Sequence, residues 1–256
     1  MIDAKSSLSA EELADCIESL ALTSPSGAVG STDIEKSVRR HWPRAVGQIA
    51  FAVNTIERRC ALLGELHPLR AMPAGLCMTR TDQSAWYTHL LAMSPQTVFR
   101  GMADEAEIRA LGVHFEQLVE QAITGMLGGN AVAIRFGWPS DCGRPPEFPA
   151  AIAWLAQKMG LQLGSGYRPP RRKDGGVDIV AWRPFTDRRT GFPVILTQCT
   201  VQRSLFEKVA DVDLRSWATW LRLLRDPTTV LAVPYILPGN TEELSVGAHN
   251  RPVIGV

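Results

Sequence analysis

Two apolar segments separated by a short polar stretch constrain the fold of this 256-residue chain more than any other feature. GVDIVAW, at 176–182, and FPVILTQCT, at 192–200, contain many of the β-branched and aromatic residues that favour strands. Between them lies RPFTDRRTG, which has the composition of a turn. The pattern predicts a β-hairpin.

Helices and further strands are expected on both sides of this hairpin. The predicted order is a helix, a strand, an inserted helix, the two hairpin strands, a helix and a closing strand, at 104–129, 131–137, 146–160, 176–182, 192–200, 204–226 and 228–237. This mixture predicts an α/β (α+β) domain at 101–256, in which helices flank a mixed central sheet.

The first hundred residues read differently, as an all-helical N-terminal region. Ser9 and Glu12 form a capping box at the start of one helix, and a long helical stretch from residue 31 is broken near Pro43 and ends at Gly64. A further helix is expected after Asp82 as its N-cap. Between the helices, SPSGAVGS reads as a flexible connection and ELHPLRAMPAGL as a loop.

Composition and the absence of common motifs exclude several classes of function. The net charge of +1 provides no overall field for a polyanion, so such a site must come from local clustering. Five scattered cysteines without a CxxC pair argue against a disulfide framework and a structural zinc site. No signal peptide, long apolar run or nucleotide-binding glycine motif is visible, so we expect a cytoplasmic protein without a membrane partner.

The hairpin carries the candidate chemistry. Asp178 opens one strand and Gln198 lies near the end of the next, so the two residues are expected at the same end of neighbouring strands. Thr200 shares a face with Gln198, whereas Cys199 points the other way, into a core. Magnesium prefers oxygen ligands, which the Asp178 carboxylate, the Gln198 amide and the Cys199 carbonyl can supply.

The surroundings of Asp178 allow a simpler reading as well. Asp174 and the two glycines that follow it are turn-forming residues, so the stretch KDGG can be a loop that leads into a buried strand. We interpret Asp174 as a turn residue and Asp178, together with Gln198, as a metal site.

The element order, with DGGVD on one strand and QCT on the next, resembles the restriction-endonuclease-like superfamily, also called PD-(D/E)xK nucleases. The resemblance is to its Mrr-type branch, in which glutamine replaces the second acid, and it covers residues 104–237. It implies a metal-dependent endonuclease with Mg²⁺ or Mn²⁺, a role in bacterial defence against foreign nucleic acid, and pairing of two copies. It also implies that an acid of the first core helix joins the site; Glu116 matches that position, with Glu120 second.

The chain departs from this family at one position. The family has a lysine two residues after the acid or glutamine, and Thr200 stands there. A hydroxyl positions water but supplies no positive charge. Lys173 or Lys208 could replace the missing lysine. The alternative is a nuclease fold that has lost catalysis and serves as a nucleic-acid-binding or scaffold subunit.

Basic residues gather around the candidate site in the sequence, and they are predicted to hold a nucleic-acid backbone. These residues are Arg168, Arg171, Arg172, Lys173, Arg183, Arg188 and Arg189. The helical N-terminal region carries no chemical motif, and it is a candidate docking surface for a protein partner.

Overall fold

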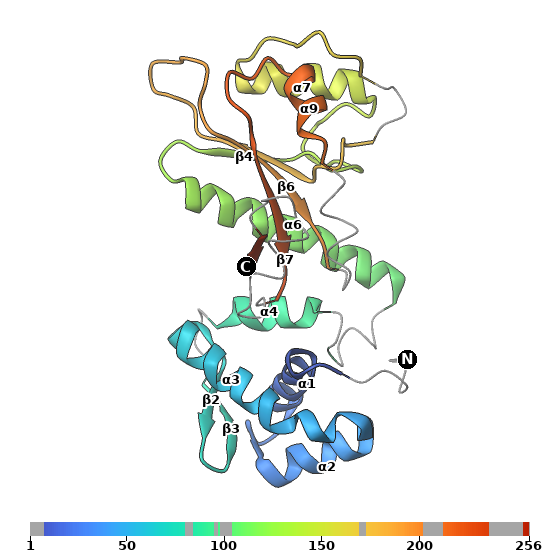
Figure 1. Ribbon diagram of the computed structural model, residues 1–256, viewed down its shortest axis with the longest axis vertical. Helices are drawn as coiled ribbons and strands as arrows, with labels where there is room; N and C mark the ends of the chain where they lie inside the picture. The colour runs from blue at the N-terminus through green and yellow to red at the C-terminus, as the bar shows by residue number, and fades with distance from the viewer. Residues whose placement is uncertain are drawn as a thin grey trace. The chain divides into compact units, whose positions relative to one another are not determined.

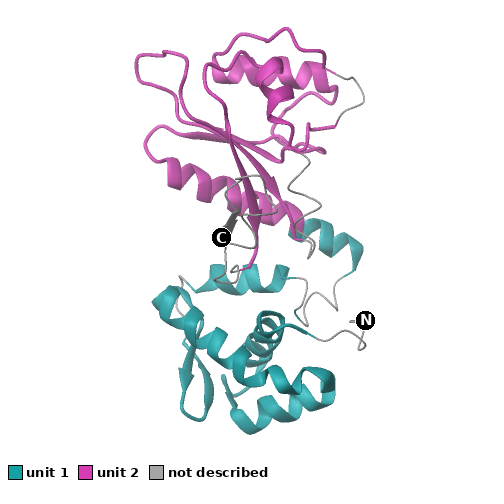
Figure 2. Cartoon of the chain, viewed as in Figure 1, with its two compact units in different colours: residues 1–111 teal, residues 112–256 magenta. Residues whose placement is uncertain are grey.

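The computed structural model describes residues 8–79, 84–94, 97, 104–168, 173–201 and 212–235, and the backbone of 253–255. The chain divides into two compact units, Met1–Leu111 (unit 1) and Gly112–Val256 (unit 2), which are treated separately below (Figure 2).

The helices of unit 1 follow the sequence closely. They are α1 (Ala10–Thr23), α2 (Ser31–His41), α3 (Ile49–Leu63) and α4 (Ala85–Met93), with short 3-10 segments at Pro43–Gln48 and Gly64–Leu66. The predicted capping box is confirmed, because Ser9 and Glu12 each accept a hydrogen bond from the backbone amide of the other, at 3.2 and 2.8 Å. The break at Pro43 and the end at Gly64 are confirmed as well.

The expectation of an all-helical N-terminal region is wrong. Unit 1 contains a three-stranded antiparallel sheet, in the order β1-β3-β2, made of β1 (Ala28–Gly30), β2 (Leu69–Met72) and β3 (Gly75–Met78). The segments that read as a flexible connection and a loop therefore contain strands. Each strand is so short that it buries at most one residue, such as Leu69 or Leu76, and so produces no visible alternation.

Unit 1 has its own hydrophobic core. It joins α1, α2, α3 and the sheet, and its members include Leu13, Ile17, Ile34, Val38, Ile56, Leu69 and Leu76. The expected N-cap of α4, Asp82, lies outside the described residues. The position directly before α4 is Ser84, whose side chain makes no capping bond.

Unit 2 is built on a five-stranded mixed sheet, in the order β4-β5-β6-β7-β8 (Figure 1). The strands are β4 (Val132–Arg135), β5 (Ile179–Trp182), β6 (Val194–Cys199), β7 (Thr228–Val233) and β8 (Val253–Gly255). The first three are antiparallel, and β6, β7 and β8 are parallel to each other. The predicted hairpin is confirmed as β5 and β6, with Ile179 opposite Thr197 and Trp182 opposite Val194.

Helices cover the sheet of unit 2. Val180, Trp182, Val194 and Leu196 face a core that they share with α7 (Phe148–Met159) and α9 (Leu214–Trp220). The long helix α6 (Glu105–Leu127) crosses the boundary between the units and lies on the other side of the sheet from α7 and α9 (Figure 1). The order of elements expected for a mixed sheet with flanking helices is therefore observed.

The helix expected to run to residue 226 ends earlier. Within the described residues, α9 stops at Trp220, and Leu221 pairs with Leu163 across an isolated bridge. The amide of Arg222 then donates to the carbonyl of Gln162 at 3.0 Å. The Leu221 amide still donates to the Trp217 carbonyl at 3.1 Å, so the helical pattern is lost from Arg222 onward. Leu224, which follows, is 64% exposed.

Candidate functional site

Asp178 lies directly before β5 and is held by the strands on both sides. Its amide donates to the carbonyl of Thr197 at 2.9 Å, and its own carbonyl accepts the amides of Phe136 and Gly137, at 2.6 and 2.9 Å. Thr197 is also the strand partner of Ile179, so Asp178 and Ile179 both lie opposite Thr197 of β6 and form a bulge. Such a bulge redirects a side chain at the end of a strand.

The Asp178 carboxylate lies between the ends of β4 and β6. Its Oδ2 accepts the backbone amide of Cys199 at 2.7 Å. A side chain at Gly137 would begin 3.3 Å from Oδ1, so the glycine leaves room for the carboxylate. The backbone and the side chain of Asp178 are thus both held in place by hydrogen bonds.

Glu116 of α6 is the second carboxylate of the site. Burial, and next the negative charge of Asp178, raise the pKa of Glu116 to about 7. The guanidinium of Arg135 opposes this shift, and its Nη1 lies 3.8 Å from Oε2 of Glu116. Glu116, which the resemblance selected on the first helix, therefore lies within electrostatic reach of Asp178 at the start of β5.

Arg135 and Asp141 belong to this cluster, although the sequence reasoning did not select them. Arg135 ends β4, is 8% exposed, and forms an ion pair with Asp141 in the following loop. The negative charges of Asp141 and Asp174 also raise the pKa of Glu116. A charged residue at the end of the apolar segment AVAIRF was the signal in the sequence that could have identified Arg135.

Cys199 and Gln198 occupy opposite faces of β6. Because side chains alternate along a strand, Gln198 shares the face of Val194 and Leu196, which pack against α7 and α9. The Cys199 thiol has a pKa well above its usual value, first because of burial and then because of the charges of Asp178 and Glu116. Cys199 is therefore on the side of the two carboxylates, and Gln198 points away from that side.

Thr200 and Lys173 are the residues considered in place of the family's lysine. Thr200 is buried, whereas Lys173 is exposed. Thr200 is 4% exposed, and its amide donates to the carbonyl of Ala232 at 3.0 Å, which extends the pairing with β7. Lys173 is exposed, and its carbonyl accepts a hydrogen bond from the buried guanidinium of Arg144. Lys208 lies outside the described residues.

The turn role of Asp174 is confirmed. Its Oδ1 accepts the amide of Gly176 at 2.9 Å, as in an Asx turn. Gly175 has a positive φ of 70°, and its carbonyl accepts the indole N–H of Trp217 at 3.2 Å. The glycines therefore pack the loop against α9.

Three of the basic residues expected beside the site lie at the opposite end of the hairpin. Arg183, Arg188 and Arg189 belong to the β5–β6 turn, whereas Asp178 precedes β5 and Gln198 is near the end of β6. The four residues of β5 separate the two ends by roughly 13 Å. Arg183 also donates to the carbonyl of Leu127, at the end of α6. The expectation of one continuous basic rim is wrong, because the turn and the strand start lie at opposite ends of the hairpin.

The remaining basic residues add little to a rim in the described structure. Arg168 donates to the carbonyl of Gly164 at 3.0 Å. Arg171 and Arg172 lie outside the described residues.

The residues present fit a hard divalent cation. Asp178 and Glu116 supply carboxylate oxygens from two elements, and their mutual repulsion would be relieved by a cation. The buried Thr197 hydroxyl, on the Cys199 face of β6, has no hydrogen-bond partner among the described residues. No three His, Cys, Asp or Glu side chains in the described part of the chain can hold a metal together, so water or phosphate oxygens would complete the shell.

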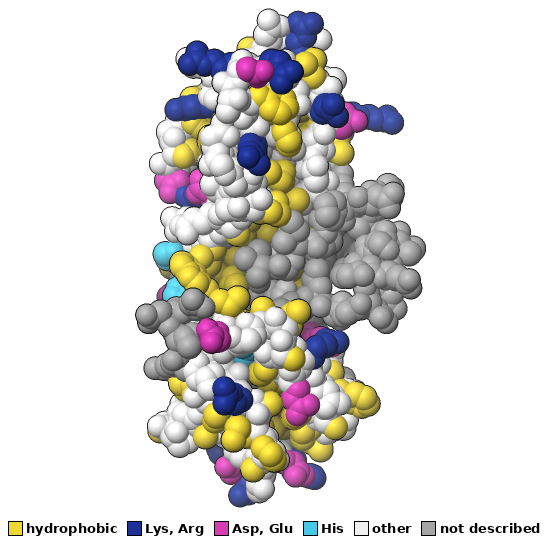
Figure 3. Space-filling model, turned by 90° about the vertical axis from the view of Figure 1, so that its left-hand side faces the viewer, with side chains coloured by type: hydrophobic (Ala, Val, Ile, Leu, Met, Phe, Trp, Pro, Cys, Tyr) yellow, Lys and Arg dark blue, Asp and Glu magenta, His cyan; other side chains and the backbone are white. Residues whose placement is uncertain are grey.

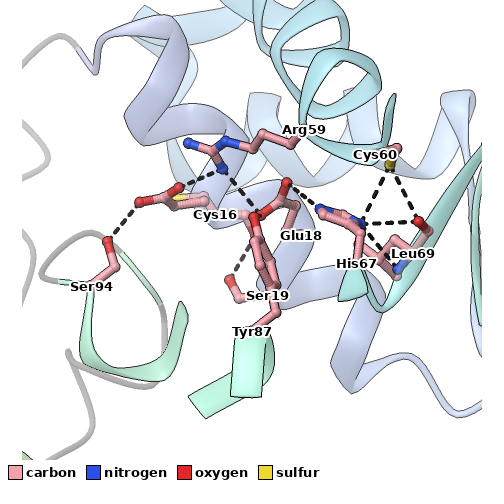
Figure 4. A network of polar contacts seen from close by, with 10 residues as sticks. Cys16, Glu18, Ser19, Arg59, Cys60, His67, Leu69, Tyr87 and Ser94 are labelled. Atoms are coloured by element: carbon pink, nitrogen blue, oxygen red, sulfur yellow. Dashed lines mark hydrogen bonds and ion pairs between the residues drawn. The ribbon is translucent and has the colours of Figure 1, made fainter. Parts of the chain in front are cut away.

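A second polar cluster lies buried in unit 1 (Figure 4). Arg59 Nη1 contacts Asp15 at 2.7 Å and Glu18 at 3.1 Å, and Glu18 accepts the Tyr87 hydroxyl at 2.7 Å. His67 Nε2 lies 3.4 Å from Glu18. Because the side chains of Glu18 and His67 are completely buried, a substrate cannot reach them, and we assign the cluster a structural role.

Comparisons of the chain with models of protein families, with curated proteins and with solved structures each found no match. Within the described residues, no helix combines the length and the apolar character needed to cross a membrane.

Proposed function

We propose that the protein is a divalent-metal-dependent endonuclease that hydrolyses phosphodiester bonds of DNA, or of RNA, and that unit 2 has a restriction-endonuclease-like core. The observation that carries the proposal is the placement of Glu116, partly buried and within electrostatic reach of Asp178: burial, and next the charge of Asp178, raise the pKa of Glu116 to about 7. The sheet supports it, because a mixed sheet that contains the β5–β6 hairpin and has flanking helices is what the sequence analysis expects.

Each residue of the pair has a role in this proposal. Asp178 is the fixed ligand, since hydrogen bonds hold both its backbone and its carboxylate. Glu116 exchanges a proton near neutral pH, as a general base does. Mg²⁺ or Mn²⁺, when bound, would neutralise charge on the phosphodiester and lower the pKa of a water molecule. Arg135 supplies a fixed positive charge beside Glu116, whereas the family's lysine position carries the uncharged Thr200.

The carbonyl of Cys199 and the Thr200 hydroxyl remain proposed parts of the site on the strand side. Gln198 is not proposed as a ligand, because it lies on the face of β6 that packs against α7 and α9, where the sequence analysis expected Cys199. Defence against foreign nucleic acid, pairing of two copies, and docking of a protein partner through unit 1 are further proposals that follow from the sequence analysis.

A second function is favoured by one observation. Thr200 replaces the charged residue of the family pattern and is buried against β7. If this replacement abolishes catalysis, the same fold acts as a nucleic-acid-binding or scaffold subunit. Metal binding distinguishes the two functions, because a site that has lost its role should bind Mn²⁺ poorly and without dependence on Asp178.

The deciding experiment is cleavage of plasmid DNA, single-stranded DNA and RNA with Mg²⁺, Mn²⁺ or EDTA. We expect metal-dependent cutting that falls at least about 100-fold in Asp178→Ala, which removes the fixed ligand, and in Glu116→Gln, which removes the general base. Glu105→Gln is the matched control, since it makes the same change at an exposed position of the same helix.

Cutting that persists in Asp178→Ala would contradict the proposed site. Absence of cutting by the wild-type protein, together with absence of Mn²⁺ binding by calorimetry, would favour the non-catalytic subunit.

A further inference from the structure

Three segments of unit 2 converge at the end of the sheet away from Asp178. They are the β5–β6 turn, the segment after α7 and the segment after α9. Leu163 bridges to Leu221, and the Arg222 amide donates to the Gln162 carbonyl at 3.0 Å. A Cβ on Gly191 of the turn would lie 3.8 Å from Leu224, so the turn lies close to the segment after α9.

Two hollows open between these segments, and we call them together the arginine hollow. One has a volume of about 610 Å³ and is bounded by Phe185, Arg189 and Arg225. The other has a volume of about 350 Å³ and is bounded by Gln162 and Arg222. Thr190 and Leu224 line both, so the two hollows adjoin. Each volume is within the usual range for a small-molecule or nucleotide site.

The arginine hollow is electropositive. It is lined by Arg189, Arg222 and Arg225, and no Asp or Glu is among its lining residues. Arg189 pairs with the exposed Asp187 of the turn, whereas the Nη1 of Arg222 donates to the uncharged amide of Gln162 at 2.7 Å. Figure 3 shows that Lys and Arg side chains predominate at this end of unit 2.

We propose that the arginine hollow binds phosphate groups of a nucleic-acid backbone, as a contact surface separate from the carboxylate site. Guanidinium groups match the geometry of phosphate oxygens and stay charged at every relevant pH. Phe185 is 40% exposed at the rim, and the Arg189 guanidinium lies over its ring, 5.4 Å from the centroid. The choice of nucleic acid over a free phosphate rests on the proposed nuclease function.

The arginine hollow and the carboxylates lie at opposite ends of β5 and on different sides of the sheet. The hollow is bounded by the segments that follow α7 and α9, whereas Glu116 belongs to α6 on the other side (Figure 1). The hollow is therefore a separate contact surface and not a continuation of the carboxylate site.

The test is binding of a labelled duplex to the full-length protein in EDTA, where cleavage does not occur. Arg225→Glu and Arg189→Glu should each weaken binding at least about fivefold at low salt and reduce the salt slope of log K by about one. Arg215→Glu, an exposed arginine on α9, makes the same charge change outside the hollow and should weaken binding less than about twofold. Circular dichroism confirms that each variant is folded.

Equal effects of all three substitutions would overturn the proposal. A second arm uses inorganic pyrophosphate: binding of pyrophosphate that depends on Arg225, with duplex binding unchanged, would overturn the choice of nucleic acid. Asp178→Asn separates this proposal from the nuclease itself. It should abolish cutting and retain duplex binding, and loss of duplex binding in that variant would overturn the separation of the two sites.

Discussion

At the scale of single residues, the pairing of Glu116 with Asp178 is the most informative feature of the molecule. Two carboxylates that share a partly buried site repel each other, and one of them then keeps its proton to a higher pH. Structural ion pairs usually join opposite charges, whereas this pair joins like charges beside Arg135. Perturbed carboxylates of this kind are enriched at functional sites.

We expect Asp178→Asn to lower the pKa of Glu116 from about 7 towards its ordinary value, because the variant removes the charge that, after burial, raises this pKa most. The lowered pKa would be measured by carbon NMR of the labelled carboxyl group, with Asp187→Asn as the control. Burial of Glu116 remains, so the pKa should stay above 4.5.

The same variant should change stability in a predictable direction. The raised pKa of Glu116 stabilises the fold fully below pH 4.5, and this contribution is lost as pH rises towards 7. In Asp178→Asn the loss should be smaller, so the metal-free variant should be more stable than the wild type at pH 7.5 by about 1 kcal/mol or less. A variant less stable than the wild type would contradict the repulsion between the two groups.

At the scale of elements, the loop before β5 is positioned by its packing against α9. Gly175 has a φ of 70°, and a Cβ there would lie 3.1 to 3.2 Å from the rings of Trp220 and Trp217. The indole of Trp217 donates to the Gly175 carbonyl. The short helix α9 therefore determines where the loop, and then Asp178, enters the sheet.

Gly175→Ala should destabilise the protein by about 1–3 kcal/mol, because it adds both backbone strain and overpacking. Gly191→Ala is the control. Gly191 has a φ of 88°, but the atom nearest to an added Cβ would be 3.8 Å away, so this variant introduces the backbone strain without the overpacking. Urea unfolding of the two variants gives the difference. Equal losses of stability would show that contact with the tryptophans is unimportant.

At the scale of the whole molecule, the two units differ in what their cores contain. The core of unit 2 is apolar and is centred on Trp217 and Trp220, whose rings pack edge to face 5.5 Å apart. Unit 1 instead buries Asp15, Glu18, Arg59 and His67 together. A buried charge is tolerated when it is paired, and removal of one partner leaves the others unpaired.

Unit 1 should therefore lose stability at alkaline pH. Burial alone would lower the pKa of His67, but the hydrogen bond with Cys60 and the Glu18 carboxylate raise it to about 9. The stabilisation is complete below pH 6.5 and is lost as pH rises through 9, with a total on the order of 3 kcal/mol. The pKa of Tyr87 is raised well above 10, so that hydroxyl does not titrate in this range.

The measurement is urea unfolding of the wild type and of His67→Gln between pH 6.5 and 9.5. The variant should be less stable at pH 6.5, and its stability should change little over that range. Exposed His41→Gln is the control and should follow the wild type. If the wild type keeps its full stability at pH 9.5, His67 is not charged in the folded protein.

The sequence by itself determined the elements with strong local signals. The capping box at Ser9, the break at Pro43, the helix ends at Gly64 and Gly160, and the β5–β6 hairpin all follow from caps, prolines, glycines and β-branched runs. The turn role of Asp174 followed in the same way. These features depend on neighbours within a few positions, and such neighbours are visible in the sequence.

Tertiary structure alone decided the sheet of unit 1, the early end of α9, the place of Arg135 and the distance between the basic turn and Asp178. Short strands gain their stability from partners far along the chain, as β1 does from β3. The Gln162 carbonyl takes the Arg222 amide that a longer helix would have bonded internally. Charged groups that act over space, such as Glu116 and Asp178, meet only when the sheet and α6 have packed, because sixty-odd residues separate them in the chain.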